Sequence, residues 1–173
     1  APAPGLRIAW LGHATSLVEI DGKRIMFDPM LSDRASQFSF TGPKRFHRAP
    51  IHLDHIKGID AVFTSHNHYD HYDHFDKRTI QRLATTGAQI FVPIGLKSTL
   101  QSWGVSDDQI SEVDWWQETK FFGLTIVTTL ARHYSNRGLF DFKKTLWVSR
   151  SVIDPEHRFF LVAIPVIQRS LLR

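Results

Sequence analysis

The chain has 173 residues, the length of one domain, and its 42% hydrophobic and 22% charged residues exclude a disordered, collagen-like or membrane-spanning chain. Lysine and arginine (21) exceed aspartate and glutamate (17) only slightly, and these cations are scattered, so we expect no nucleic-acid partner. The chain has no cysteine, which excludes disulfides and thiolate sites and leaves His, Asp and Glu as the possible metal ligands.

The first half of the chain is predicted to be rich in β-structure. Asp21-Gly22 is a strong hairpin signal between two short apolar segments. Residues 31–58 contain prolines and no clear period, which predicts a long loop, and residues 75–84 have the apolar spacing of a helix. The strands predicted in this half are residues 6–11, 16–20, 24–27 and 59–65.

The second half continues with alternating strands and helices. A helix is predicted at residues 96–103, ended by Gly104. The strands predicted here are residues 89–93, 124–130, 144–152 and 158–164. These elements indicate a single α/β domain over residues 1–173, with a mixed sheet and helices outside it.

A pattern of the form H-x-H-x-D-H follows the predicted strand that precedes the first helix. At the end of a strand, residues i and i+2 project to the same side, so His66 and His68 can bind one cation. The turn of the chain brings Asp70 and His71 to a second position beside it, which suits a binuclear hydrolase. The alternative is a loop and helix start, with Asp70 or Asp73 as the N-cap and the imidazoles exposed.

Several phrases of the sequence together resemble one protein family over residues 6–160. They are WLGHATSLVEIDG, FDPMLSDRAS, GPKRF, IDAVFTSHNHYDHYD, FVPIGL, DWW, ARHYSNRG and KTLWVSRSVI. They resemble the metallo-β-lactamase superfamily, and within it the N-acyl-phosphatidylethanolamine-hydrolysing phospholipases D and their bacterial relatives. The resemblance implies an α/β (α+β) fold, an αββα sandwich that holds two metal ions, usually zinc, at one sheet edge.

The resemblance also implies roles for individual residues. His66, His68 and His133 match ligands of the first zinc ion. Asp70 and His71 match ligands of the second zinc ion and are the candidate catalytic residues. Taken alone, a lone histidine such as His133 would more often have an ordinary surface or core role.

Two further residues are candidates for supporting positions around the metal ions. Asp28, in a Phe-Asp-Pro phrase, matches a position that orders the metal-binding loop through hydrogen bonds, although an isolated Asp-Pro is simply a turn. His13 either lies near the site or is a turn residue. The aromatic pairs Trp115-Trp116 and Phe121-Phe122 either line a groove for an acyl chain or belong to the core and its rim.

The implied function is a zinc-dependent hydrolase in which a metal-bound hydroxide attacks the phosphodiester of an N-acylated phospholipid. One alternative is a lactonase or phosphodiesterase of small phosphorylated metabolites, and another is a catalytically inactive metal-binding fragment. The expected partner is accordingly a phospholipid or a small phosphorylated substrate. We expect a soluble protein, in the cytoplasm or peripherally attached to a membrane. The chain could be a monomer or a homodimer.

The family pattern breaks after Phe160. Relatives continue into a Gly-Asp-(Thr or Ser)-Gly-Tyr phrase, whose aspartate bridges the two metals, and later supply a further histidine; residues 161–173 contain neither. Reverse translation of residues 162–167 permits that phrase in a shifted frame, so we expect an out-of-frame tail on a C-terminally truncated domain. We therefore expect one well-held zinc ion, on His66, His68 and His133, and uncovered apolar surface that favours association.

Overall fold

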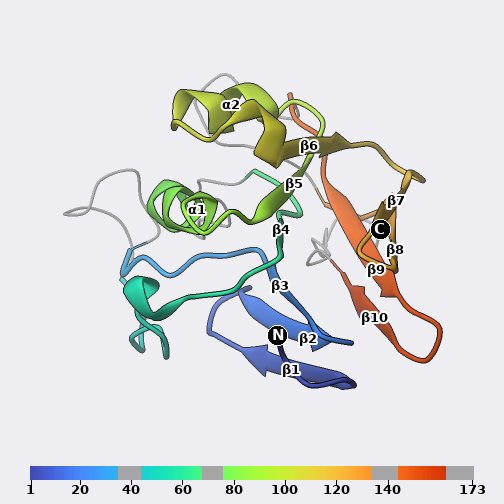
Figure 1. The fold of residues 1–173 in the computed structure, drawn as a ribbon. Helices are drawn as coiled ribbons and strands as arrows, with labels where there is room; N and C mark the ends of the chain where they lie inside the picture. The colour runs from blue at the N-terminus through green and yellow to red at the C-terminus, as the bar shows by residue number, and fades with distance from the viewer. Residues whose placement is uncertain (35–43, 68–75, 134–143, 163–173) are drawn as a thin grey trace, which may run out of the picture.

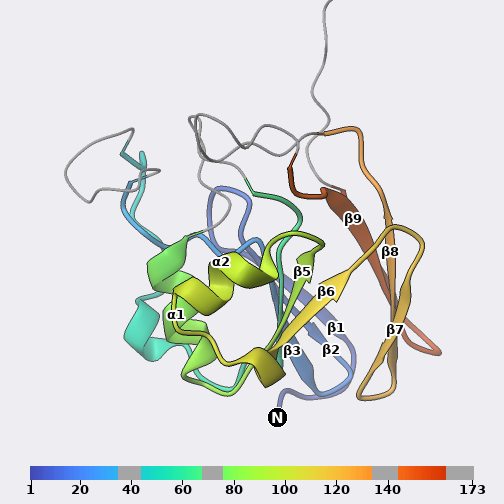
Figure 2. The same cartoon turned by 90° about the horizontal axis from the view of Figure 1, so that it is seen from above.

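The computed structural model describes residues 1–34, 44–67, 76–133 and 144–162. Its elements form three layers: two helices lie on one face of a six-stranded sheet, and a four-stranded sheet covers the other face (Figure 1). The view from above shows the three layers side by side (Figure 2). The predicted α/β sandwich is confirmed, and the described segments contain no second helical layer.

The six-stranded sheet is antiparallel in its first half and parallel in its second half. Its strands, in spatial and chain order, are β1 (Leu6–Trp10), β2 (Ser16–Ile20), β3 (Lys23–Phe27), β4 (Ala61–Phe63), β5 (Gln89–Pro93) and β6 (Ile110–Val113). The hairpin predicted at Asp21-Gly22 is present, with φ angles of 43° and 81°. Positive φ at both central residues gives the turn a twist that matches the twist of the two strands.

The helices are α1 (Lys77–Ala84) and α2 (Lys97–Ser102), with short 3-10 helices η1 (Leu53–His55) and η2 (Asp107–Gln109). Helix α1 begins later than predicted because Asp76 is its N-cap: the Asp76 carboxylate accepts hydrogen bonds from the backbone N–H groups of Arg78 and Thr79. The alternative caps Asp70 and Asp73 lie outside the described residues. No helix in the described segments is long and apolar enough to cross a membrane.

The four-stranded sheet is antiparallel, in the order β10-β9-β8-β7. Its strands are β7 (Glu118–Phe121), β8 (Leu124–Leu130), β9 (Val148–Ile153) and β10 (Arg158–Leu161). Strand β8 has the predicted bounds, whereas β9 begins four residues later than predicted. The expected tail is described only at residues 161 and 162, and residues 163–173 lie outside the described part of the chain.

Aromatic rings fill the space between the two sheets. The ring of Phe63 on β4 stacks against those of Phe27 and Phe91 on the neighbouring strands, with centroid distances of 5.3 and 4.7 Å. Phe159 and Phe121 approach this stack from the four-stranded sheet, at 5.3 Å from Phe27 and 5.6 Å from Phe91 respectively. The stack therefore joins the two sheets directly beneath the ends of β3 and β4.

The two adjacent aromatic pairs divide between the interior and the surface. Trp115 is partly buried and donates a hydrogen bond from Nε1 to the Trp147 carbonyl (2.7 Å), and Phe121 packs on the core. Their neighbours Trp116 and Phe122 are 66% and 69% exposed. This is the arrangement expected of core and rim residues.

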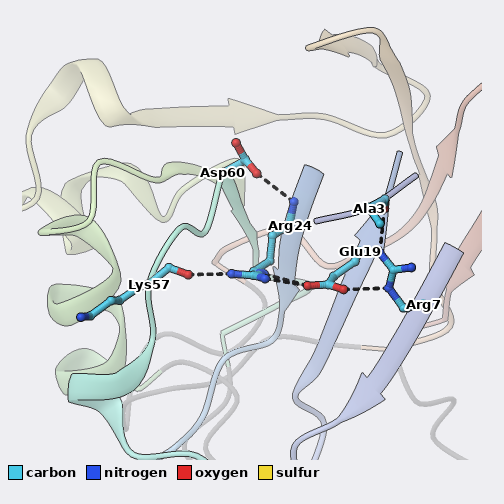
Figure 3. A network of polar contacts seen from close by, with 6 residues as sticks. All are labelled: Ala3, Arg7, Glu19, Arg24, Lys57 and Asp60. Carbon is cyan, nitrogen blue, oxygen red and sulfur yellow. Dashed lines mark hydrogen bonds and ion pairs between the residues drawn. The ribbon is translucent and has the colours of Figure 1, made fainter. Parts of the chain in front are cut away.

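Polar contacts connect the first three strands on the helix-facing side of the six-stranded sheet (Figure 3). Glu19 on β2 binds Arg7 on β1 (3.0 Å) and Arg24 on β3 (2.7 Å). Arg24 also donates to the Lys57 carbonyl, and its backbone N–H donates to Asp60. The hydrogen bonds from Arg24 and Arg7 lower the pKa of Glu19. The network ties the antiparallel strands to the segment that leads into β4.

Candidate metal centre

The candidate site forms where segments from both sheets meet at one end of the sandwich. Asp28 directly follows β3, and Ser65 and His66 closely follow β4. Because β3 and β4 are parallel, with Phe27 opposite Phe63, the residues that follow both strands emerge at the same sheet edge. His133 arrives from the other sheet, after β8.

The two described ligand candidates face each other across this junction. The Nε2 atoms of His66 and His133 are 3.0 Å apart, with ring centroids at 4.2 Å and an angle of 81° between the rings. The His66 side chain is 1% exposed and His133 is half-buried. The structure thus brings together two histidines that the sequence predicts as ligands of one metal ion.

Ser65 positions the His66 ring. Its Oγ lies 2.7 Å from His66 Nδ1, and its carbonyl accepts a hydrogen bond from the backbone N–H of Val148, at the start of β9 (2.8 Å). When Nδ1 carries the ring proton and donates it to Ser65, Nε2 keeps a lone pair for a metal ion. Ser65 was not predicted from the sequence, because a single serine after a strand carries no motif.

Asp28 in turn holds Ser65. Its Oδ1 accepts a hydrogen bond from the Ser65 backbone N–H at 2.6 Å, and its own N–H donates to the Phe63 carbonyl at 2.8 Å. The residue is 4% exposed and has a positive φ of 41°, which turns the chain away from β3. Burial raises the pKa of Asp28 to about 6, although hydrogen bonds from Ser65 and the positive charge of Arg150 oppose this rise. Asp28 is therefore placed to order the loop that carries His66, while its role in supporting a metal ion stays a prediction.

Arg150 lies under the site, between the two sheets. Its side chain comes from β9 and is 1% exposed, with Nη2 donating to the Thr64 carbonyl at 3.0 Å and the guanidinium 4.8 Å from the Phe63 ring centroid. Burial lowers the pKa of Arg150 to about 9, so it remains charged at neutral pH. Sequence reasoning missed this residue, since an arginine within an apolar strand usually points to solvent.

His13 lies in the turn between β1 and β2, with a positive φ of 52°. Burial, followed by the positive charge of Arg45, lowers the pKa of His13. Arg45 holds this turn and the loop after β3 together, because it donates to the carbonyls of Leu11 (3.2 Å) and Met30 (2.7 Å). His13 is thus a turn residue at the end of the sheet where Asp28 also lies.

The other predicted site residues, His68, Asp70 and His71, lie outside the described residues. The described pair nevertheless fits a metal ion. Two nitrogen ligands bound tetrahedrally to zinc at about 2.1 Å lie about 3.4 Å apart, close to the 3.0 Å between His66 Nε2 and His133 Nε2. Imidazole nitrogen suits zinc, iron, copper and nickel ions, so the donor chemistry alone does not select zinc.

Comparison with known proteins places these features in one family. A family model described as a beta-lactamase superfamily domain matches residues 23–163. An uncharacterized protein of Mycobacterium tuberculosis is 43% identical over 158 residues, which cover 91% of this chain and 42% of that protein. N-acyl-phosphatidylethanolamine-hydrolyzing phospholipase D 1 of Caenorhabditis elegans is 38% identical over 165 residues, covering 90% of this chain and 46% of that protein. The chain thus spans less than half the length of these relatives.

A solved structure agrees with the sandwich architecture. A metallo hydrolase from the hyperthermophilic archaeon Ignicoccus hospitalis superposes with a TM-score of 0.63 at 20% identity, over 92% of this chain and 61% of that one. At this identity the superposition establishes the fold.

Proposed function

Because this chain belongs to the beta-lactamase superfamily, we propose that it is part of a zinc-dependent hydrolase that cleaves the phosphodiester bond of N-acyl-phosphatidylethanolamine. The observation that carries this proposal is the approach of His66 Nε2 to His133 Nε2, which joins two imidazoles from different sheets at a metal-binding distance. The substrate class is supported by the 38% identity to the Caenorhabditis elegans phospholipase D.

The proposal assigns His66, His68 and His133 to a first zinc ion, and Asp70 and His71 to a second. Zinc bound by such residues supplies a Lewis acid for a phosphoryl oxygen and lowers the pKa of a water molecule toward neutrality. The chain's own contribution is to hold the ligands in place. Burial of the His66 ring also excludes water, which strengthens electrostatic interactions at the site.

Hydrolysis of the phosphodiester consumes one water molecule and releases phosphatidic acid and an N-acylethanolamine. The proposal is tested by incubating the zinc-loaded chain with vesicles that contain N-acyl-phosphatidylethanolamine and measuring both products. The variants His66→Ala and His133→Ala are expected to reduce product release at least 100-fold. The matched control is His52→Ala, which removes an exposed histidine paired with Asp54 and is expected to leave the rate unchanged.

Two results would overturn the proposal. Turnover of water-soluble lactones or small phosphodiesters without turnover of vesicles would favour a hydrolase of small phosphorylated metabolites. Stoichiometric zinc binding with no turnover of either substrate class would identify an inactive metal-binding fragment. Loss of activity in His52→Ala equal to that in His66→Ala would show that the assay reports folding and not the site.

A further inference from the structure

A second cluster of ligand-type side chains joins two hairpins from different sheets. Asp21 lies in the turn between β2 and β3, and Asp154 and His157 lie in the turn between β9 and β10 (Figure 1). One ligand atom from each of the three residues lies within 4.8 Å of the other two. His157 Nδ1 is 3.1 Å from Asp21 Oδ2 and 3.6 Å from Asp154 Oδ2.

Backbone hydrogen bonds orient both carboxylates. Asp154 Oδ1 accepts from the N–H groups of Glu156 (2.6 Å) and His157 (2.8 Å), so the other oxygen, Oδ2, is directed toward the cluster. Asp21 Oδ1 accepts from the Gly5 N–H (2.9 Å), and its Oδ2 likewise faces His157. Asp154 therefore uses one oxygen to hold its own turn, Asp21 uses one to hold Gly5 before β1, and each presents its second oxygen to the shared space.

One oxygen of the Asp154 carboxylate is buried without a hydrogen-bond donor in the described segments. The residue is 8% exposed, and its Oδ2 is buried and has no hydrogen-bond partner in the described segments. A buried carboxylate oxygen without a donor is unfavourable unless a cation compensates it. The two nearby groups, Asp21 and His157, supply a further carboxylate and an imidazole, both of which are side-chain types that bind metal ions.

We propose that Asp21, Asp154 and His157 bind a divalent transition-metal ion, with zinc as the probe ion. Ligands at about 2.1 Å from a tetrahedral zinc ion lie about 3.4 Å apart, and the distances of 3.1 and 3.6 Å to His157 Nδ1 bracket this value. One imidazole nitrogen with two carboxylate oxygens favours zinc or a similar ion over calcium and magnesium, which prefer oxygen ligands alone. The alternative is an ion pair between His157 and the two carboxylates, with no metal ion bound.

This site is separate from the candidate metal centre. Strand β9 begins at Val148, whose backbone N–H donates to the Ser65 carbonyl beside His66, and ends at Ile153, directly before Asp154. Six residues of extended chain cover about 20 Å. The ion would therefore act structurally, by linking the β2–β3 hairpin of one sheet to the β9–β10 hairpin of the other, and the inference does not depend on the proposed function.

The test compares zinc content and thermal unfolding of the whole chain with those of Asp154→Asn and His157→Gln. After zinc loading and gel filtration, both variants are expected to contain one zinc ion fewer per chain than the parent, and to lose at least half of the zinc-induced rise in melting temperature. The matched control is His52→Gln, which removes an exposed histidine 3.2 Å from Asp54; this pair has no third ligand group close by among the described residues, so the variant is expected to keep the full zinc content. Equal zinc content in all four proteins would overturn the proposal and leave the ion pair.

A second measurement on the unmodified chain covers the case in which a variant fails to fold. Co²⁺, a paramagnetic ion that accepts the same ligands as zinc, is expected when added to the ¹⁵N-labelled chain to broaden or shift the amide signals of Gly5, Glu156 and His157, which hydrogen-bond to the two carboxylates. The amide of Asp54, beside the control pair, is expected to stay sharp at the same Co²⁺ concentration. Broadening or shifting that is no greater at the three amides than at Asp54 would contradict the site.

Discussion

The Nε2 atoms of His66 and His133 lie 3.0 Å apart although the two histidines are 67 positions apart in the sequence. His66 follows β4 of the six-stranded sheet, and His133 follows β8 of the four-stranded sheet. The pair therefore exists only when the two sheets pack face to face. Any change that separates the sheets is expected to lower metal affinity as well as stability.

Removing the Ser65 hydroxyl is expected to weaken metal binding without unfolding the chain. Ser65→Ala deletes the 2.7 Å contact with His66 Nδ1, and loss of such a supporting contact typically lowers metal affinity about 10- to 100-fold. Competition with a chromogenic zinc chelator measures the change.

Ser102→Ala is the matched control for this prediction. It deletes a hydroxyl that donates to the Thr99 carbonyl on α2, far from the histidines in sequence, and is expected to leave zinc affinity unchanged. An unchanged affinity in Ser65→Ala would mean that the His66 ring needs no support from Ser65.

The stability of the metal-free chain is expected to depend on pH through Asp28. Its pKa is about 6 in the folded chain and 3.8 in the unfolded chain, so the folded state holds this proton more tightly. The corresponding stability is fully present below pH 3.8 and is lost as pH rises through 6. The difference of about two pKa units corresponds to about 3 kcal/mol.

Asp28→Asn removes this titration and retains an oxygen acceptor for the Ser65 N–H. Urea unfolding in the presence of a chelator, at pH 4 and pH 7, should therefore show the variant gaining stability relative to the parent by about 2 kcal/mol between the two pH values, which is most of the full effect because pH 4 lies just above the unfolded pKa. A stability difference that is constant with pH would show that Asp28 is not the titrating group.

Local signals in the sequence, such as turn dipeptides and the spacing of apolar residues, explain which elements could be predicted. The Asp21-Gly22 turn was predictable because that dipeptide tolerates positive φ at both positions. Strands β6 and β7 were missed: β6 has only two buried apolar residues, and β7 alternates between exposed and half-buried positions in an ETKF segment. Such short segments gain their strand structure from pairing with β5 and β8, which a local pattern does not contain.

The site residues that belong to a sequence motif were predictable, and those whose roles arise only from tertiary packing were not. The sequence indicated His66, His133 and Asp28, and the structure places all three at one end of the sandwich. Ser65 and Arg150 were not predictable from local patterns. The role of Ser65 depends on the parallel pairing of β3 with β4, and that of Arg150 depends on the packing of β9 against these two strands.

The Phe63 ring is expected to contribute strongly to stability. It is 1% exposed and stacks with the rings of Phe27 and Phe91, so Phe63→Ala should create a cavity and lower the free energy of unfolding by about 3–5 kcal/mol. Phe46→Ala removes a fully exposed ring and should change it by less than about 0.5 kcal/mol. Denaturant unfolding measures both, and equal effects would contradict the assignment of Phe63 to the core.

The buried charge of Arg150 is expected to lower the free energy of unfolding, and the Asp28 carboxylate is expected to offset part of this cost. Its Nε and Nη1 are buried and have no hydrogen-bond partner in the described segments, and the cost of burying its charge is only partly offset. The positive charge of Arg150 also lowers the pKa of Asp28, so the two residues stabilise each other's charged forms. In the Asp28→Asn background that compensation is gone, and Arg150→Met, which keeps an unbranched apolar stem in place of the buried charge, should raise the free energy of unfolding by about 1–4 kcal/mol.

In the parent background at pH 7, Arg150→Met should raise the free energy of unfolding by a smaller amount, because the Asp28 carboxylate loses its nearby positive charge. A double-mutant cycle at pH 7 measures the difference, with an expected coupling free energy of about 0.5–3 kcal/mol. Additive effects would show that the two charges do not interact. A loss of stability for Arg150→Met in the Asp28→Asn background would have a different meaning. It would show that the contacts of Arg150 with the Thr64 carbonyl and the Phe63 ring outweigh the cost of its burial.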